Sequence, residues 1–519
     1  MVALIEPGHF RLSRAEGSHL VIHAVDATIV VVYMLAMIVL GVYLGRGQRD
    51  LKGYLLGGRD LPWYAILGSI VATETSTATF LSIPGITFAS TGDMRFLQLT
   101  IGYIVGRVLV AIVLLPLFFR GEIYTAYELL NERFGGLSKQ AASLLFLVTR
   151  NLGDGLRLFL AGIALEKVLD IPLPIAIVVI GIATIFYTFA GGMKAVIWSD
   201  CLQLLIYMVG GIVSLWMLSS SIPGGLGQLT EFSEMTGKSR VFDFRIVSVD
   251  GFSLWTEPYT LLAGLIGGAM LTLGTHGTDQ MFVQRYLAAR SQRDASVAVI
   301  ASGFVVLLQF ALFLLIGIAL ACFYDQVAPR SFDRNDEVFA TFVVEHLPVG
   351  VVGLTLAAIF AAAMSTLSSS LNSSAGALVA DFYLPWRSRK GKKDDSIHQL
   401  RVTRWVTIAY GCLQILIGIG ASWISESVVQ NALAIAGFTA GIMLGLFGLG
   451  FLTRSAHQRG VLVGMLGGLV FLTYVKFGTS VAWTWLAVIG AFMTFALGLI
   501  ASWILPRSGI DESDKLVSE

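Results

Sequence analysis

The sequence predicts an all-α integral membrane protein with thirteen transmembrane spans. Of its 519 residues, 55% are hydrophobic and 13% are charged, whereas a typical soluble domain carries about 25% charged residues. Apolar runs of about 20 residues recur along the chain, and each is long enough to cross a hydrocarbon core of ~30 Å. The lipid bilayer is therefore the first partner that we expect. The predicted spans are 27–45, 63–88, 95–119, 139–165, 172–190, 195–219, 257–285, 294–323, 347–383, 401–423, 428–453, 460–477 and 482–505.

Basic residues predict how these spans are oriented. Loops that follow odd-numbered spans hold the main clusters, for example Arg46 and Arg49 after the first span and Arg387 and Arg389 after the ninth. Because basic loops stay on the cytoplasmic side, we expect the segment 1–24 outside the cell and the tail 506–519 inside. The predicted location is the inner (plasma) membrane. The longest external loop, 220–256, is expected to form a cap over the spans.

Other features of the composition narrow the function. The net charge of +1 gives no sign of nucleic-acid binding, and three cysteines stand far apart, without a CxxC motif. The chain contains neither HExxH nor GxSxG, and no paired carboxylates at short spacing, so we do not expect an enzyme. Residues 1–24 are too polar for the core of a signal peptide. No obligatory protein partner is evident.

Hydroxyl residues interrupt the ninth span in "AAAMSTLSSSLNSSAGALVADFY", residues 361–383. At helical spacing, Ala358, Ala362, Ser365, Ser369 and Asn372 fall on one stripe. Small and hydroxyl residues are enriched where membrane helices pack, and close packing is one explanation of the stripe. Packing alone needs only Gly and Ala, whereas clustered hydroxyl oxygens also suit a hard cation such as Na⁺.

The second span carries a matching polar centre, "ATETSTATFLSIPG", at residues 72–85. Its hydroxyl and β-branched residues, followed by Pro84 and Gly85, predict a helix that is broken inside the membrane. Unwound backbone is tolerated there only where it lines a cavity or is buried in protein, and transporters use the freed carbonyls to hold a coupling ion. A merely kinked structural helix is the alternative.

Five motifs, in this order and spacing, make the chain resemble the sodium/solute symporter family from about residue 25 to 505. They are "GGRDLPWYAILGSIVATETSTATFLSIPG", "YTAYELLNERFG", "YTFAGGMKAVIWSDCLQ", "TDQMFVQRYLAA" and "AAIFAAAMSTLSSSLNS". The resemblance implies a leucine-transporter-type inverted repeat of five plus five helices, with one extra helix before it and two after it. It also implies Na⁺-driven symport of a small organic solute into the cell by alternating access. The organisation that follows is an N-terminal segment (1–24), a leading helix with the first cytoplasmic loop (25–62), a first repeat (63–219), an external loop (220–256), a second repeat (257–453), two trailing helices (454–505) and a tail (506–519).

The resemblance further implies where Na⁺ binds. For the first site, it assigns carbonyls of Ala72, Thr75 and Ala362 and the hydroxyls of Ser365 and Thr366. For a second site, present in some members, it assigns Asp200 together with Ser368, Ser369 and the two hydroxyls of the first site. A carboxylate within a span is costly and points to function by default. The alternative is that Asp200 lies near the inner interface and pairs with Lys194 or a loop arginine.

The solute is left open among sugars, sialic acids, carboxylates and amino-acid-like compounds. The candidate solute contacts are Glu74, Ser76, Thr79, Thr100, Arg157 and Phe438. Charged residues within the spans either touch the solute or brace the helices through ion pairs; they are Glu74, Arg107, Arg150, Asp154, Arg157, His276 and Asp279.

Two other classes of membrane protein fit the sequence less well. A channel would line its pore with rings of like groups, which this chain lacks. A nutrient sensor that binds a solute without transporting it is the alternative function, although the chain carries no signalling module.

Overall fold

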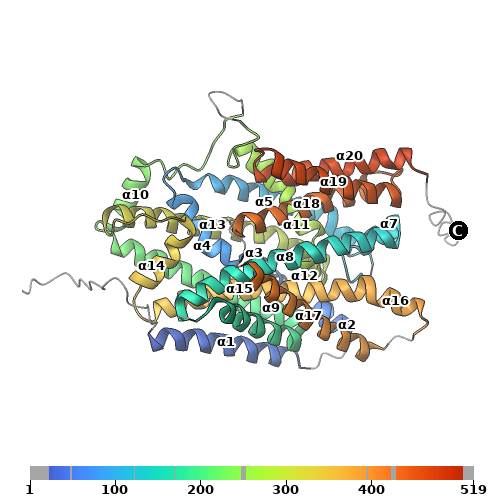
Figure 1. The fold of residues 1–519 in the computed structure, drawn as a ribbon, viewed down its shortest axis with the longest axis horizontal. Coiled ribbons are helices and arrows are strands. Elements are labelled where there is room, and N and C mark those ends of the chain that lie inside the picture. The colour runs from blue at the N-terminus through green and yellow to red at the C-terminus, as the bar shows by residue number, and fades with distance from the viewer. Residues whose placement is uncertain are drawn as a thin grey trace, which may run out of the picture.

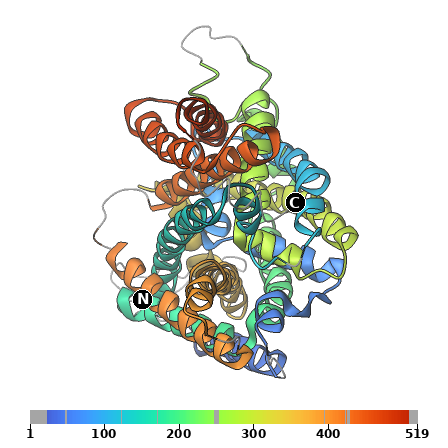
Figure 2. The same ribbon diagram turned by 90° about the vertical axis from the view of Figure 1, so that its right-hand side faces the viewer.

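The computed structural model describes residues 23–46, 50–121, 123–169, 171–246, 253–392, 395–421, 423 and 428–506. This part of the chain is helical and contains no β-strand; a single parallel bridge joins Leu61 to Ala289. Most of the long helices run along the long axis of the molecule (Figure 1). Viewed along that direction, they form one bundle, with the C-terminal helices on one side (Figure 2).

The helices have the following bounds. The first half holds α1 (Ala24–Leu44), α2 (Leu51–Leu56), α3 (Trp63–Glu74), α4 (Thr77–Phe88), α5 (Leu97–Leu109), α6 (Leu115–Phe118), α7 (Glu128–Phe134), α8 (Gly136–Leu169), α9 (Leu173–Ser221) and α10 (Gly225–Met235). The second half holds α11 (Gly268–Thr278), α12 (Gln280–Leu287), α13 (Gln292–Gln326), α14 (Val338–His346), α15 (Val351–Leu378), α16 (Leu384–Arg389), α17 (Ser396–Ala421), α18 (Val428–Leu452), α19 (Gln458–Gly478) and α20 (Leu486–Ile504). Short 3₁₀ or π turns extend several of them, namely η1 (Gly57–Arg59), η2 (Met94–Phe96), η3 (Val110–Leu114), η4 (Ala263–Gly267), η5 (Asn335–Glu337), η6 (Val379–Tyr383) and η7 (Trp483–Trp485).

Within the described residues, nine helices are long and apolar enough to cross a membrane, or ten if the bent pair α3–α4 forms one span. Each of the thirteen predicted ranges overlaps a helix, and the two predicted spans 172–190 and 195–219 lie on either side of a kink within α9. The helix α8 and the segment from η4 to α12 are not among the nine. Large apolar side chains remain exposed on the outer helices, including Val39 on α1 and Phe477 on α19, as expected of surfaces that face lipid.

The second predicted span is broken, as its sequence indicates. The helix α3 ends at Glu74, the backbone of Thr75 and Ser76 is extended, and α4 restarts at Thr77 with a bend of 61° between the two halves. A reciprocal capping box starts α4, because the Ser76 and Thr79 side chains each bind the other's backbone N–H. The hydroxyl residues thus replace the helical hydrogen bonds that the break removes.

A second helix pair is broken at Asp279. This residue is extended and separates α11 from α12. Its Oδ1 atom accepts a hydrogen bond from the backbone N–H of Met281 over 2.8 Å, which caps α12. An acidic N-cap is favourable because it satisfies a free N–H near the positive end of the helix dipole.

The range α9 joins two helical segments at a kink, and the kink lies between the predicted spans 172–190 and 195–219. Gly192 forms the kink with a φ of +53° and a ψ of −161°, a non-helical conformation that is open to glycine but strained for other residues. Next to the kink, Gly191 packs closely against Gly41 of α1. The predicted boundary between the two spans therefore coincides with the point at which the helical geometry is interrupted.

The helix α15 lies inside the bundle and packs against α9, α8, α1 and α17. The most apolar stretch of 18 residues between Val351 and Arg389 is 89% buried. Every hydroxyl residue of the predicted stripe is buried as well. Its N-terminus is capped from α1: Oδ1 of Asp26 accepts hydrogen bonds from the backbone N–H groups of Gly350 (2.7 Å) and Gly353 (2.8 Å). Asp26 is itself buried. The leading helix therefore positions the helix that carries the hydroxyl stripe.

The segment predicted as a long external loop, 220–256, contains the helix α10 and is held by contacts at Lys238 and Asp243, among others. The Lys238 ammonium is buried and donates to the backbone carbonyls of Thr87 (2.8 Å) and Ala89 (2.6 Å), at the end of α4. Asp243 accepts a hydrogen bond from Arg95, next to the start of α5, over 3.0 Å. These contacts hold the segment against the ends of two helices.

Candidate functional site

The break between α3 and α4 frees backbone carbonyls that α15 then contacts. In a continuous helix, the Ala72 carbonyl would accept from the Ser76 N–H, but that N–H binds the Thr79 hydroxyl instead. The Ala72 oxygen accepts from the Ser365 hydroxyl over 2.8 Å. The Thr73 oxygen accepts from the Thr366 hydroxyl over 3.2 Å. The predicted polar centres of the second and ninth spans are therefore in direct contact.

These oxygen atoms form a compact group. The Ser365 hydroxyl lies 3.1 Å from the Ala362 carbonyl oxygen, and the Thr366 hydroxyl lies 3.3 Å from the same oxygen. Ala72, Ala362, Ser365 and Thr366 are all buried. Carbonyl and hydroxyl oxygens without a formal charge are the donor set that transporters present to Na⁺.

Thr75, the remaining residue predicted for this group, is fixed by a network that the sequence prediction missed. Its hydroxyl donates to Oε1 of Gln309 on α13 over 2.9 Å, and the Tyr207 hydroxyl on α9 donates to the same Gln309 atom over 3.1 Å. All three residues are buried. Gln309 is the single amide side chain in the apolar run "FVVLLQFALFLL". A polar residue within such a run is the sequence signal that could have indicated this contact. The network holds the extended backbone at the break from two further helices.

Asp200 is fully buried beside the hydroxyls of α3 and α15. Its Oδ2 atom accepts from the Ser69 hydroxyl over 2.5 Å and from the Thr73 hydroxyl over 3.3 Å. The Thr73 hydroxyl in turn lies 3.1 Å from the Ser369 hydroxyl. The hydroxyls of Ser368 and Ser369 both donate to the Ser365 carbonyl. The residues predicted for a second cation site are therefore neighbours, and the group borders the first one through Ser365.

The Arg285 guanidinium, which the sequence prediction did not consider, also contacts Asp200. Its Nη2 atom donates to Oδ2 of Asp200 over 3.1 Å and to the Ser369 hydroxyl, and Arg285 is fully buried. The suggested pairing of Asp200 with Lys194 or a loop arginine is wrong, because Lys194 lies beside Asp60 and Arg285 belongs to α12. The other carboxylate oxygen, Oδ1 of Asp200, is buried without a hydrogen-bond partner among the described residues.

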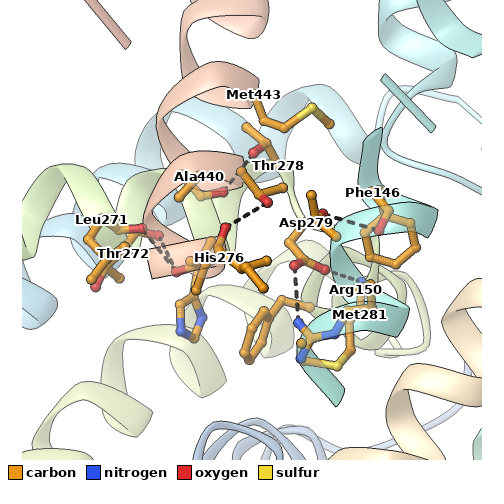
Figure 3. Close-up of a pocket in the computed structure, with 18 of the residues that line it drawn as sticks. Phe146, Arg150, Leu271, Thr272, His276, Thr278, Asp279, Met281, Ala440 and Met443 are labelled. Atoms are coloured by element: carbon orange, nitrogen blue, oxygen red, sulfur yellow. Dashed lines mark hydrogen bonds and ion pairs between the residues drawn. The ribbon is translucent and has the colours of Figure 1, made fainter. Parts of the chain in front are cut away.

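A cavity of about 150 Å³ lies next to the broken helix. Residues of α3, α5, α8, α11, α12 and α18 line it. In Figure 3, Phe146 and Arg150 of α8 approach it from one side, Thr272 and His276 of α11 from another, and Ala440 and Met443 of α18 from a third. A cavity of this size holds a molecule about as large as benzene.

Glu74 lines the cavity and forms an ion pair with Arg107. Nη2 of Arg107 donates to Oε2 of Glu74, and the same oxygen lies 3.6 Å from Nε2 of His276. Arg107 and His276 are buried, whereas the Glu74 side chain is 20% exposed. His276 is supported from α12 by the Tyr286 hydroxyl, 2.9 Å from its Nδ1 atom. Glu74 therefore faces the cavity from a firmly held ion pair.

A second charged group faces the cavity from α8. Asp154 is buried between two arginines: Arg150 donates to it over 2.6 and 3.0 Å, and Nη1 of Arg157 donates over 2.6 Å. Arg150 also approaches Asp279, at 3.3 Å. Arg150, Arg157 and Asp279 line the cavity. These charged residues thus form an ion-pair network and also part of the cavity wall. Bracing of the helices and contact with the solute, the two alternatives for these residues, therefore do not exclude each other.

The remaining predicted solute contacts lie outside the lining of this cavity. Ser76 and Thr79 cap α4, and the Thr100 hydroxyl donates to the Leu97 carbonyl within α5. Phe438 lies on α18, partly buried in the apolar core. Of the six predicted residues, Glu74 and Arg157 belong to the lining. Thr73, Tyr103 and Thr439 also line it and were not predicted.

Known proteins share this architecture along most of the chain. The sodium/sialic acid symporter SiaT of Proteus mirabilis is 30% identical over 501 residues, which cover 94% of this chain and 97% of SiaT. The sodium/sialic acid symporter NanT of Aliivibrio fischeri is 29% identical and is covered to 94%, with 93% of this chain matched. A solved structure of a Na⁺-coupled sialic acid symporter in a substrate-bound outward-open state superposes with a TM-score of 0.83 at 28% identity, over 93% of this chain and 99% of that one.

A more distant structure shows the same fold only. It is Mhp1, a nucleobase-cation-symport-1 family transporter, with a TM-score of 0.57 at 13% identity, over 88% of this chain and 95% of Mhp1. The family model described as "Sodium:solute symporter family" matches residues 54–468. This match covers more than half of the chain and confirms the resemblance carried by the five motifs. The chain belongs to the sodium:solute symporter family.

Proposed function

We propose that this protein is a secondary active transporter that uses a Na⁺ gradient to move a small organic solute into the cell by alternating access. One observation carries the proposal: carbonyl oxygens freed at the break of α3 meet the hydroxyls of Ser365 and Thr366 on α15, beside a cavity that Thr73 and Glu74 line. An oxygen-lined position next to a solute cavity is how transporters built on broken helices couple an ion to a solute. The relatives named as sodium symporters support the same function.

The first Na⁺ site in this proposal consists of the carbonyls of Ala72, Thr75 and Ala362 and the hydroxyls of Ser365 and Thr366. Four of these residues supply oxygens that lie within 2.8 to 3.3 Å of a neighbouring member of the group. In the structure the hydroxyls donate to the carbonyls, so binding of Na⁺ requires each hydroxyl proton to turn away and present its oxygen to the ion. Hydroxyl groups can do this because the proton rotates freely about the C–O bond.

The solute in this proposal is an organic acid whose acidic group binds Arg157. Nη1 of Arg157 is engaged by Asp154, and the side chain remains 21% exposed in a residue that lines the cavity. A guanidinium with free N–H groups is well suited to a carboxylate. The first Na⁺ site has no acidic member, so an anionic solute would offset the charge of the bound ion. Sialic acid, which the relatives' names mention, is the first compound to test, although a sugar acid of that size needs the cavity to widen.

A second Na⁺ is proposed at Asp200, Ser368 and Ser369, where it must bind beside Arg285 or replace it. The Arg285 guanidinium occupies Oδ2 of Asp200, so Na⁺ must bind at the free Oδ1 atom or displace Arg285. A buried carboxylate oxygen without a partner is costly. That cost supports a cation at Oδ1 during part of the transport cycle.

The thirteen spans, the five-plus-five inverted repeat and the inside position of the basic loops are part of the same proposal. The two broken helix pairs, α3–α4 and α11–α12, support the repeat because each would be the first member of its five-helix unit. The proposed orientation places the segment from α10 to Asp243 outside the cell.

Uptake of labelled sialic acid and other organic acids into proteoliposomes, with and without a Na⁺ gradient, tests the function. Transport separates a carrier from a sensor that only binds its ligand. Ser365→Ala removes a hydroxyl from the first site, and we expect the apparent Na⁺ affinity to fall by about 10- to 100-fold, the usual value of a contact to a charged partner. Ser373→Ala is the matched control on the same helix, because the Ser373 hydroxyl donates only to the Ser370 carbonyl among the described residues. An unchanged Na⁺ dependence in Ser365→Ala would contradict the site.

A further inference from the structure

A patch of positive charge lies where the chain leaves α16 and turns toward α17. Lys390 and Lys392 both lie over the indole ring of Trp386, with their ammonium nitrogens 4.4 and 5.9 Å from the ring centroid. Arg389 precedes them at the end of α16, and the three basic side chains are exposed. Among the described residues, none of the three forms an ion pair with a carboxylate. Like charges at short range repel, so this patch favours the approach of an anion.

The ends of this turn are held in place. The helix α15 continues through η6 into α16, and the Tyr383 hydroxyl of η6 lies 2.7 Å from Nε2 of His398 on α17. Oδ1 of Asp395 accepts hydrogen bonds from the backbone N–H groups of Ile397 (3.0 Å) and His398 (3.2 Å), which caps the start of α17. The patch lies at the end of the molecule opposite to α10 and α14 (Figure 1). The basic side chains are therefore presented at a defined place on the molecule.

The neighbouring surface has the order of groups that is typical of a membrane interface. On α17, Arg401 is exposed, Trp405 one turn further on is 64% exposed, and Leu416 is 66% exposed. They fall on one side of the helix and extend over about 22 Å of its length, at 1.5 Å per residue. Basic, aromatic and aliphatic side chains in this order match the headgroups, the interface and the hydrocarbon of a bilayer. Trp386, which is 46% exposed, gives α16 an aromatic residue beside the same basic turn.

We infer that this turn binds the headgroups of anionic phospholipids, and that Arg389, Lys390 and Lys392 contact the phosphate. Trp386 anchors the turn at the interface while the two lysines remain over its ring. Each Lys or Arg near a membrane surface raises the affinity for anionic lipid by about fivefold. Because α16 continues from α15, a bound lipid stabilises the end of the helix that carries Ser365. The inference concerns the bilayer and depends neither on Na⁺ binding nor on the solute.

Two lipids with the same acyl chains and different headgroups test the inference on the full-length protein in nonionic detergent. Short-chain phosphatidylglycerol is anionic, and short-chain phosphatidylcholine has no net charge. We expect phosphatidylglycerol to raise the midpoint of thermal unfolding with an affinity about 100-fold above that of phosphatidylcholine, the product of three fivefold gains. The difference should shrink as the NaCl concentration rises, because salt screens exposed charges. Inorganic phosphate at the same concentration should leave the midpoint unchanged.

Two matched double variants localise the effect. Lys390→Gln with Lys392→Gln should lower the affinity for phosphatidylglycerol by about 25-fold, the loss expected for two basic residues. Lys390→Arg with Lys392→Arg keeps both charges and should retain the wild-type affinity. The control is Arg330→Gln with Arg334→Gln, which removes the same net charge from exposed residues that each pair with a carboxylate. We expect the control to bind phosphatidylglycerol as the wild type does.

Three results would overturn the inference. Equal affinity of the wild type for the two lipids would show that the headgroup charge is not recognised. Equal losses in the Lys390/Lys392 and Arg330/Arg334 glutamine variants would show a response to net charge without a site. Stabilisation by inorganic phosphate as strong as that by phosphatidylglycerol would assign the patch to a soluble anion. The comparison of the two lipids on the wild type is decisive even if a variant does not fold.

Discussion

Arg285 donates a hydrogen bond to Oδ2 of Asp200 over 3.1 Å, and both side chains are fully buried. This pair joins α12 to α9, and the Ser69 and Ser369 hydroxyls join α3 and α15 to the same group. Four helices therefore meet at one ion pair, in the place where a second Na⁺ is proposed. If a second Na⁺ binds here as proposed, it either shares the Asp200 carboxylate with Arg285 or displaces that guanidinium.

Asp200→Asn tests that stoichiometry. If a second Na⁺ binds, the substitution should lower the Hill coefficient for Na⁺ from about two to about one. Each Na⁺ contributes ~2.3 kcal/mol per 100 mV of membrane potential and ~1.4 kcal/mol per tenfold gradient. With the monovalent organic anion proposed here, two Na⁺ per cycle carry one net positive charge inward, whereas one Na⁺ per cycle is electroneutral, so the variant should lose the coupled current.

The wild-type protein is the deciding control for this prediction. A Hill coefficient of about one, with electroneutral uptake of a monovalent acid, would show that the second site does not exist. Asp200 would then serve to hold Arg285, and Asp200→Asn should mainly lower thermal stability.

Arg107→Gln should destabilise the protein strongly. The substitution leaves Glu74 without its cation partner, and breaking a buried ion pair in this way costs about 3–5 kcal/mol. The Glu74→Gln, Arg107→Gln double variant should be more stable than Arg107→Gln alone, because no uncompensated charge remains. Thermal unfolding in detergent, with a double-mutant cycle, measures the coupling. Arg330→Gln is a suitable control, since its pair with Glu345 is half-exposed and such pairs contribute at most about 1 kcal/mol.

The cap that α1 places on α15 should be measurable as well. Asp26→Ala removes the acceptor for two backbone N–H groups, those of Gly350 and Gly353. Loss of an N-cap costs about 0.5–2 kcal/mol, so the midpoint of thermal unfolding should fall. Asp26→Asn keeps an acceptor oxygen and should recover part of the loss. Equal stability of Asp26→Ala and the wild type would show that the cap contributes nothing.

The polar centres of this protein could be predicted from the sequence because a polar residue is unfavourable in lipid wherever it occurs. Such a residue is therefore visible within its own span, without knowledge of the rest of the fold. The hydroxyl residues of the second span predict a broken helix, and the helix breaks at Thr75 and Ser76, whereas Pro84 and Gly85 lie within α4. The stripe through Ser365 follows from helical spacing and is buried in the structure. Glu74 and Arg107 were expected either to contact the solute or to form ion pairs, because intramembrane charges need partners, and they form a pair.

Contacts between distant parts of the chain could not be predicted in the same way. Arg285 and Ser69 are 216 residues apart in sequence, and no periodic pattern shows that α12 and α3 meet. Similarly, α10 lies within a segment whose glycines and serines favour a loop, and its packing against other helices decides its conformation.

The last prediction concerns the anchor at Asp243. Hydrogen bonds from Arg245, joined by one from Arg95, hold the pKa of Asp243 well below its ordinary value of 3.8. Because the folded-state pKa is lowered, this carboxylate stabilises the fold above about pH 3.8, and its contribution is lost as the pH falls below that value. Other carboxylates titrate in the same range, so the comparison must be with Asp243→Asn, which cannot change charge there. Between about pH 5 and about pH 3, the thermal midpoint of the wild type should fall further than that of Asp243→Asn. Parallel curves for the two proteins would show that the contact with Arg95 does not hold the segment in place.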